Sequence, residues 1–289
     1  MISGTNITLY VDGKKDATAA DFSQLYTLGG ITGLYFGSDQ YGNDYQGIID
    51  DLRVFTYARS PAQIAWDFSR GKAQWQLKLD QSSGSTAYDS GAMATNGTLQ
   101  NNAAFDTTAG NCKFSYCVDL DGTNDYISTG SFSPLAVAAL ATDTISWGGW
   151  YYLTSTSGTA SRVLFEKASE LKISTNADSK PLCQIYTGGA YAPASPSNLP
   201  QAITTDTWYN VFCIYDGANV KTYINGQLAA TNSQAGSVTA VSSAAYVGVD
   251  SGQNGDVSGR VDDQYVFNFT LTSSQILDLY NSQSGVSFR

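Results

Sequence analysis

The sequence predicts an all-β protein, an antiparallel sandwich of two sheets with short helices at the ends of its repeated parts. Many short runs with strand-like alternation or strong β-propensity are separated by Gly, Asn and Ser turns. Helical periodicity is confined to two short stretches that begin at Pro61 and Ser273. This pattern, many short strands with turns between them, is typical of antiparallel sandwiches.

Each strand-like run either alternates apolar with polar residues or is apolar throughout. Gly and Asn in the intervening turns supply the positive φ that tight connections need. In order, the expected strands are 75–80, 116–121, 125–128, 144–152, 163–165, 171–173, 182–186, 208–215 and 220–224. Residues 188–200 contain three of the six prolines and are expected to form an exposed loop.

An internal repeat sets the domain boundaries. The run GIIDDLRVFTY at 47–57 aligns without a gap with GRVDDQYVFNF at 259–269, an offset of 212 residues. Each run is expected to be a strand that leads into a short closing helix, with Ser60 and Thr272 as the N-caps. The repeat predicts a complete domain at 72–289. Residues 1–71 are expected to be the C-terminal part of a first domain, too few strands to bury a core of their own.

Composition excludes several classes of function. The net charge is −10 and no strongly basic cluster is present, which argues against nucleic acid or an anionic membrane as the partner. No apolar run approaches the ~18–20 residues that span a bilayer. Only 14% of the residues are charged, while 42% are apolar, which is enough for a substantial core.

Four cysteines form two plausible pairs. Cys112 and Cys117 have a spacing that suits a hairpin, and Cys183 and Cys213 lie in two strand-like runs that could be neighbours. Two disulfides and an oxidising, extracellular or cell-surface location are expected, with buried free thiols as the alternative. A zinc site is not expected, because the chain has no histidine and no C-x-x-C pair.

The ordered motifs WQLKLD, VDLDGTNDYIS, TISWGGWYY, TWYNVFCIYDG and GRVDDQYVFNF resemble the concanavalin A-like lectin/glucanase superfamily. They are most similar to its laminin G-like (pentraxin-like) domains. The resemblance covers residues 72–281, and residues 7–68 resemble the last third of the family pattern. It implies a two-sheet jelly roll, most often a non-catalytic module for glycan or protein adhesion, in many cases with a bound Ca²⁺.

Some members of this superfamily are glycosidases, which place two carboxylates close together on one strand. The chain has only two glutamates, Glu166 and Glu170. Residues four apart on a strand lie roughly 13 Å apart, too far for the roughly 5–5.5 Å of a retaining pair. No enzyme is therefore expected, and the two glutamates are interpreted as part of a solvated charged turn with Lys167 and Lys172.

Four aspartates are the candidate metal ligands: Asp121, Asp125, Asp262 and Asp263. Neighbouring strand residues point to opposite faces, so one member of the pair 262–263 must face a packed layer. A buried carboxylate needs a partner. Either Ca²⁺ or backbone N–H groups would serve, and the sequence leaves both open.

Aromatic rings on an open sheet face or its rim loops are the expected glycan platform. The candidates are Tyr191, Tyr186, Trp150 and Tyr152, with core packing as the alternative for each. The leading hypothesis is a non-catalytic extracellular carbohydrate-binding or adhesion module of a larger surface protein that binds a glycan or a surface glycoprotein, with Ca²⁺ dependence left open. The alternative is a structural subunit of a surface layer, filament or sheath, in which residues 1–71 pair with neighbouring copies by strand addition.

Overall fold

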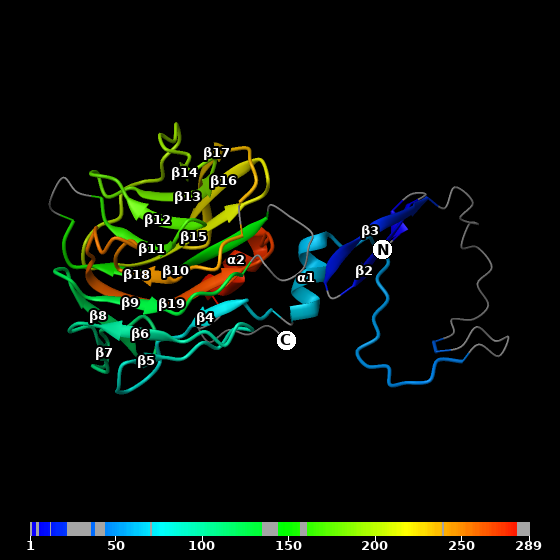
Figure 1. Cartoon of the computed structure of the whole chain (residues 1–289), viewed down its shortest axis with the longest axis horizontal. Coiled ribbons are helices and arrows are strands. Elements are labelled where there is room, and N and C mark those ends of the chain that lie inside the picture. Colours follow the sequence, from blue (N-terminus) through cyan, green and yellow to red (C-terminus); the bar gives the residue numbers. More distant parts are fainter. Residues whose placement is uncertain are drawn as a thin grey trace. The chain divides into compact units, whose positions relative to one another are not determined.

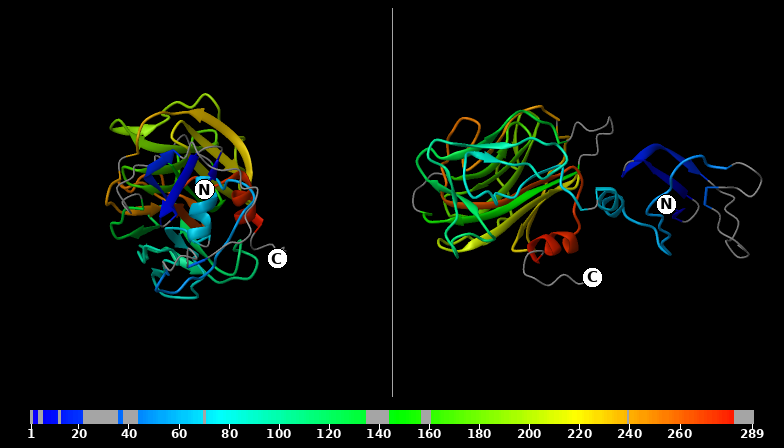
Figure 2. Two further views of the ribbon diagram at one scale, coloured as in Figure 1. Left: turned by 90° about the vertical axis from the view of Figure 1, so that its right-hand side faces the viewer. Right: turned by 90° about the horizontal axis from the view of Figure 1, so that it is seen from below.

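The computed structural model describes residues 2–3, 6–11, 13–21, 36–37, 44–69, 71–134, 144–156, 161–238 and 240–281. The chain divides into two compact units, residues 1–71 and residues 72–289. Figure 1 shows the strands of the second unit stacked in two layers, and Figure 2 gives two further views. No helix in the described ranges is long and apolar enough to cross a membrane.

The second unit is the predicted antiparallel sandwich. Its first sheet, called the β10 sheet, runs in the order β17, β16, β15, β10, β19, β8 and β7, and β4 also pairs with β19. These strands are β4 (Trp75–Leu77), β7 (Ala104–Asp106), β8 (Cys117–Asp121), β10 (Ile145–Leu153), β15 (Trp208–Tyr215), β16 (Asn219–Ile224), β17 (Gln227–Ser233) and β19 (Ser258–Phe267).

The second sheet, called the β12 sheet, runs in the order β14, β13, β12, β11, β18, β9, β6 and β5. Its strands are β5 (Thr86–Ala87), β6 (Gly97–Gln100), β9 (Tyr126–Thr129), β11 (Val163–Lys167), β12 (Leu171–Thr175), β13 (Pro181–Thr187), β14 (Ala190–Ala192) and β18 (Ala245–Val247). Strand β14 corrects the expectation of a loop throughout 188–200, because residues 190–192 pair with β13 as a hairpin.

One continuous apolar core lies between the two sheets. Trp147 and Tyr151 of the β10 sheet and Leu171 and Ile185 of the β12 sheet belong to it, and all four are fully buried. Because side chains alternate along a strand, the residues between these positions point to the outer faces, away from the core. The disulfide Cys183–Cys213 joins β13 of one sheet to β15 of the other, and Cys112–Cys117 closes a short loop before β8. Both predicted pairings are confirmed.

Each unit ends in a helix with the same N-terminal arrangement. Helix α2 (Ser273–Asn281) begins after Thr272, whose hydroxyl accepts the Gln275 N–H while the Gln275 side chain accepts the Thr272 N–H. Helix α1 (Pro61–Ser69) begins after Ser60, which forms the same reciprocal pair with Gln63. These capping boxes confirm both predicted N-caps.

The first unit has a small sheet of β1 (Ile2–Ser3), β2 (Asn6–Val11) and β3 (Lys14–Asp21), in addition to α1. The predicted strand at 47–57 is wrong as a description of this structure, since none of these residues lies in a strand. Its counterpart β19 pairs with β10 on one side and with β8 and β4 on the other. A strand forms only where such neighbours exist, and the described part of the first unit provides none for 47–57.

Candidate functional site

The outer face of the β12 sheet carries a row of polar and aromatic side chains. The register of the strand pairs places these residues side by side, one from each of five adjacent strands, over about 19 Å at ~4.8 Å per strand. From β13 to β9 the row is Gln184, Lys172, Glu166, Tyr246 and Ser128. Core residues such as Leu171, Ile173 and Ile185 alternate with them and point the other way.

A buried ion pair lies at the centre of this row. The Lys172 Nζ is 3.1 Å from the Glu166 Oε2, and the Ser251 N–H donates to the Glu166 Oε1 at 3.3 Å. Asp250 is 4.0 Å from the same ammonium group. Glu166 is only 2% exposed, so the expected solvated turn is wrong. The charges are held in place by hydrogen bonds and by one another, which fixes the direction of the carboxylate.

Glu170 and Lys167 are likewise buried, with both side chains fully inaccessible and 3.3 Å apart. The Lys167 ammonium donates to the Val241 carbonyl and the Ser243 hydroxyl, and the Val241 N–H donates to Glu170. Burial raises the pKa of Glu170 and lowers the pKa of Lys167, while their attraction opposes both shifts. This pair ties the β11–β12 turn to the segment before β18 and is a structural element of the sheet end.

Two tyrosine pairs flank the Glu166–Lys172 pair on the same face. Tyr126 and Tyr246 have ring centroids 6.3 Å apart and lie on one side of it. Tyr186 and Tyr191 meet edge to face with centroids 5.2 Å apart and lie on the other side. All four rings are partly exposed. The face therefore offers apolar ring surface on either side of fixed polar groups, an arrangement found in small-molecule sites.

Tyr191 is anchored as well as exposed. Its hydroxyl accepts the Ser169 N–H at 3.0 Å and lies 3.4 Å from the Lys167 carbonyl. The Lys172 ammonium is 5.2 Å from the centre of its ring, within the range of a cation–π contact. Burial, and then the charge of Glu166, raise the pKa of Tyr191. Tyr191 and Tyr186, both predicted as ligand residues, thus lie together on this face.

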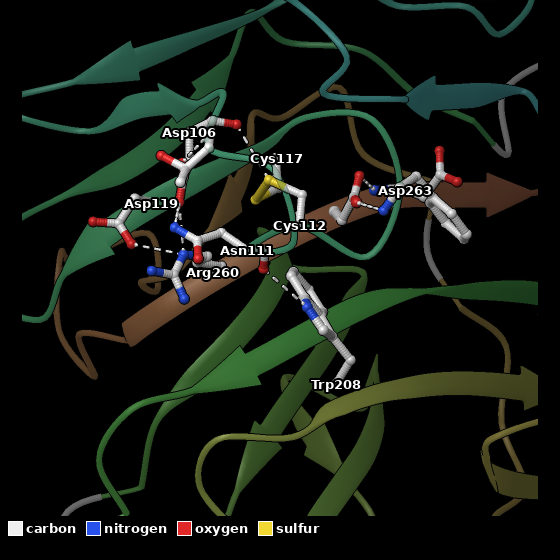
Figure 3. The surroundings of a disulfide bond; sticks show 11 residues. Asp106, Asn111, Cys112, Cys117, Asp119, Trp208, Arg260 and Asp263 are labelled. Carbon is white, nitrogen blue, oxygen red and sulfur yellow. Dashed lines mark hydrogen bonds and ion pairs between the residues drawn. A yellow bond between two sulfur atoms is a disulfide. The ribbon is translucent and has the colours of Figure 1, made fainter.

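A second cluster lies on the outer face of the β10 sheet (Figure 3). Register places Trp208, Tyr152, Arg260 and Asp119 in one row across β15, β10, β19 and β8. The Tyr152 and Trp208 rings are 5.5 Å apart, and the Arg260 guanidinium lies 5.3 Å from the Tyr152 ring. This row also has aromatic surface beside charged groups, and it contains Tyr152 of the predicted set.

The Cys112–Cys117 disulfide supports this second row. It closes the turn that directly follows Asn111, whose carbonyl accepts the Trp208 indole N–H at 3.2 Å (Figure 3). Asn111 also donates to Asp106, which accepts a further bond from the Arg260 Nε at 2.9 Å. Burial raises the pKa of Asp106, but hydrogen bonds from Thr108, Asn111 and Arg260 outweigh it and lower the pKa to about 2. The loop therefore fixes both Trp208 and Arg260.

Trp150 is not part of either platform. It is 2% exposed, stacks on Tyr280 of helix α2 and has Phe114 packed edge-on against it. The Lys113 ammonium covers the ring at 4.1 Å. The prediction of Trp150 as a ligand residue is corrected, because the closing helix and the 113–114 loop bury the ring.

The four predicted metal ligands do not form one site. Asp121 lies opposite Ser258 in the β8–β19 ladder, so Asp262 is four residues farther along, about 13 Å away. Ligands to one Ca²⁺ must lie within 2.3–2.6 Å of the ion, so these two cannot share it. Within the described residues, the one group of three or more Asp, Glu, His or Cys side chains with close ligand atoms is Asp106, Cys112 and Cys117, whose two sulfurs form a disulfide.

Backbone N–H groups take the place of a cation at two of these aspartates. Asp125, 2% exposed, accepts the N–H groups of Asn102 and Asp121. Asp262, fully buried, accepts those of Phe114 and Asp263. Burial, and then the charge of Asp263, raise the pKa of Asp262 to about 8. The residues present therefore satisfy the hydrogen-bonded alternative and do not fit a shared calcium site.

The sequence matches one protein-family model. The model described as the concanavalin A-like lectin/glucanases superfamily matches residues 1–65 and 121–277, which is more than half of the chain. The chain belongs to this superfamily. The two matching segments fall in the two parts of the internal repeat. A search of curated proteins found no match.

Several solved structures share this fold. Domain 4 of AbnA, a GH43 extracellular arabinanase from Geobacillus stearothermophilus in complex with arabinotriose, is 18% identical, with a TM-score of 0.55 over 72% of this chain and 98% of that chain. The ligand-binding domain of botulinum neurotoxin serotype D, in complex with N-acetylneuraminic acid, is 14% identical, with a TM-score of 0.55 over 73% and 51%. The binding domain of Paraclostridial Mosquitocidal Protein 1 is 14% identical, with a TM-score of 0.53 over 74% and 53%. The present chain spans about half the length of the two toxin domains. These likenesses show the fold.

Several residues of the two rows were absent from the candidates predicted from sequence. The sequence pattern places Glu166 and Lys172 in a solvated turn, and it gives no signal for Tyr246, Trp208 and Arg260. Glu166 and Lys172 meet within one hairpin, whereas Tyr246, Trp208 and Arg260 are each separated from their neighbours in the row by tens of residues, so only strand order brings these three into place. The signal that could have found Glu166 is its position directly after the apolar run Val163–Phe165 in a chain with only two glutamates.

Proposed function

We propose that residues 72–289 form a non-catalytic carbohydrate-binding module that holds a glycan on the outer face of the β12 sheet. The observation that carries this proposal is the pair of tyrosine clusters on either side of the fixed Glu166–Lys172 ion pair. Sugar rings present C–H surfaces that pack on aromatic rings, and hydroxyl groups that bond to fixed carboxylates and ammonium groups. The face provides both chemistries within neighbouring strands.

A neutral glycan suits this face better than an acidic one. Glu166 and Asp250 are close to a single cation, Lys172, so the local charge is negative before any ligand arrives. The whole chain has a net charge of −10, which further disfavours an anionic ligand. The fold shared with domain 4 of AbnA, which was solved with arabinotriose, supports a neutral oligosaccharide.

The two disulfides support an oxidising compartment, and we place the module outside the cell or at its surface. The separation of the four aspartates gives no support for a calcium-dependent mode of binding. Binding is therefore proposed to rest on Tyr186, Tyr246 and the partly exposed Lys172 and Asp250, with the buried Glu166 fixing the Lys172 ammonium and no cation required.

A glycan array with the intact chain tests the proposal, in calcium and again in EDTA. We expect binding of a neutral glycan with equal strength in both conditions. Tyr246→Ala and Tyr186→Ala should each weaken it about tenfold, since one stacked ring is lost. Tyr152→Ala and Trp208→Ala are the matched controls on the other sheet and should leave the affinity unchanged.

The possible outcomes separate the alternatives. If the controls lose affinity and the β12-sheet variants do not, the site lies on the β10 sheet and the assignment made here is wrong. If EDTA abolishes binding, a calcium site exists that these side chains do not explain. No binding to any glycan in either condition contradicts the function itself and favours the structural subunit.

A further inference from the structure

The outer face of the β10 sheet presents two aromatic rings whose polar atoms are already bonded within the protein. Trp208 and Tyr152 are neighbours on the paired strands β15 and β10, and both are partly exposed. The Trp208 indole N–H donates to the Asn111 carbonyl, and the Tyr152 hydroxyl donates to Asp206 at 3.3 Å. These bonds fix how the rings lie and leave ring surface for contact with a ligand.

Among the described residues, carboxylates outnumber cations along the row of Trp208, Tyr152, Arg260 and Asp119, called the Trp208 row. The Arg260 Nε lies 2.9 Å from Asp106 and 3.4 Å from Asp119 (Figure 3). Asp206 is exposed and adds a third carboxylate beside Tyr152. The side chain of Asp119 is 53% exposed, whereas that of Arg260 is 20% exposed. A ligand therefore meets aromatic surface that is bordered by negative charge.

The nearest lysine along β10 belongs to another row. The Lys113 ammonium lies 4.1 Å from the centre of the Trp150 ring, and Trp150 is two positions from Tyr152 on the same strand. Burial lowers the pKa of Lys113, and the charge of Asp262 opposes this shift. The Trp208 row thus keeps its excess of carboxylates, in line with the net charge of −10 on the whole chain.

The strands beneath the Trp208 row use their main-chain groups within the sheet. β15, β10 and β19 are each paired on both sides. A peptide that binds by strand addition needs an exposed sheet edge, so a ligand here must be held through its side groups. A chain of sugar rings can bind in this way, because C–H faces pack on aromatic rings while the substituents reach charged groups. Adjacent strands are ~4.8 Å apart, so successive sugar rings can contact successive side chains of the row.

We propose that the Trp208 row is a second binding site, which takes an oligosaccharide of amino sugars whose amino groups carry no acetyl group. The sugar rings lie along Trp208 and Tyr152, and the protonated amino groups face Asp119 and Asp206. A cation is favoured twice at this position, by the carboxylates and by the ring faces. The site is on the opposite outer face from the β12 sheet, and the inference does not depend on glycan binding there.

An acidic sugar is a poorer fit to the same row. The Arg260 guanidinium is already held by Asp106 and Asp119, and it lies 5.3 Å from the Tyr152 ring. A carboxylate on the ligand would compete with these two fixed carboxylates for the guanidinium, and it would also face Asp206. A protonated amine meets the opposite conditions, since each of these carboxylates attracts it.

Isothermal titration calorimetry of the intact chain tests the assignment with three probes. They are an oligomer of β-1,4-linked glucosamine, its fully N-acetylated form of the same length, and an oligolysine with the same number of amino groups. The titrations are run at about pH 5.5, where the amines are protonated and carboxylates of ordinary pKa are ionised. The N-acetylated form keeps the sugar rings and loses the charge, whereas the oligolysine keeps the charge and has no rings.

We expect the glucosamine oligomer to bind about tenfold more tightly than either of the other probes. Tyr152→Ala and Trp208→Ala should each weaken its binding about tenfold, and Asp119→Asn about threefold, because an exposed charge contributes less than an aromatic contact to a cation. Tyr152→Phe is the matched variant that keeps the ring and loses only the bond to Asp206, so it should retain the affinity. Tyr88→Ala removes an exposed tyrosine outside both rows, and it should have no effect.

Four results would overturn the assignment. Equally tight binding of the N-acetylated form, with the same loss in Trp208→Ala, would show that charge plays no part. Equally tight binding of the oligolysine would show that the partner is a basic protein. Loss of glucosamine binding in Tyr246→Ala but not in Trp208→Ala would place the site on the β12 sheet. Absence of any binding by the glucosamine oligomer would exclude the ligand class, and it would leave the proposal of neutral-glycan binding untouched.

Discussion

Removing the Cys183–Cys213 disulfide should destabilise the second unit far more than removing Cys112–Cys117. The first bond closes a loop with a sequence separation of 30 and joins the two sheets, and the second closes a separation of 5 within one hairpin. Loop-closure entropy then predicts about 3.6 kcal/mol for the first and about 2 kcal/mol for the second. Cys183 and Cys213 are also 2% and 0% exposed, so their replacement removes buried contacts as well.

The assay is urea unfolding of Cys183→Ala/Cys213→Ala and of Cys112→Ala/Cys117→Ala. Unfolding is monitored by circular dichroism, so that changes in tryptophan emission do not affect the measured stability. Tryptophan emission in the absence of urea is the second readout. The Cys112→Ala/Cys117→Ala variant should change it, because the turn no longer holds the Asn111 carbonyl against the Trp208 indole. Trp208→Phe should remove that change, which separates it from any effect of the other variant on Trp147, the residue paired with Cys213. Equal or reversed losses of stability would refute the loop-length argument, and unchanged emission would refute the proposed support of Trp208.

Two further predictions concern buried charges. Asp106 has a folded pKa of about 2, below its unfolded value, so it stabilises the fold above pH ~4 and this contribution is lost as the pH falls through 2. Asp106→Asn should therefore cost about 1–2 kcal/mol at pH 7 and progressively less as the pH falls through 2, measured by urea unfolding across pH. A cost that stays constant with pH would contradict the assignment. Lys167→Met leaves Glu170 buried without its cation and should cost about 3–5 kcal/mol in thermal or urea unfolding, with part recovered in Lys167→Met/Glu170→Gln. Lys172→Met is the control for the second of these, because Lys172 is 17% exposed and should cost less.

Local patterns predicted most of the fold because they depend on neighbours in the chain. The run Trp208–Tyr215 was expected as a strand and is one, and the caps at Ser60 and Thr272 follow from residues three positions apart. Both disulfides were predicted from spacing and strand-like context. Apart from Cys183–Cys213, which joins the two sheets, each of these features is fixed by a few adjacent residues.

The candidate site was predicted only in part because it depends on strand order. Tyr186 and Tyr191 are neighbours in one hairpin and were chosen together. Glu166 and Tyr246 lie on paired strands but 80 residues apart in the chain, and no local pattern shows that they meet. Trp150 and Tyr152 share a strand face, yet helix α2 covers one and leaves the other partly open. The burial of Trp150 by a helix distant in the chain likewise cannot be predicted from the alternation of residues along its strand.

The two copies of the closing strand show where sequence pattern stops being sufficient. GRVDDQYVFNF and GIIDDLRVFTY share glycine, the aspartate pair and Val-Phe, and both are followed by a capped helix of the same length. One forms a buried central strand and the other is exposed outside any strand. The local preference is nearly equal, so the difference comes from the hydrogen-bonding neighbours, β10, β8 and β4, which within the described residues only the first has. A strand in the middle of a sheet is thus a property of the set of strands and not of its own residues alone.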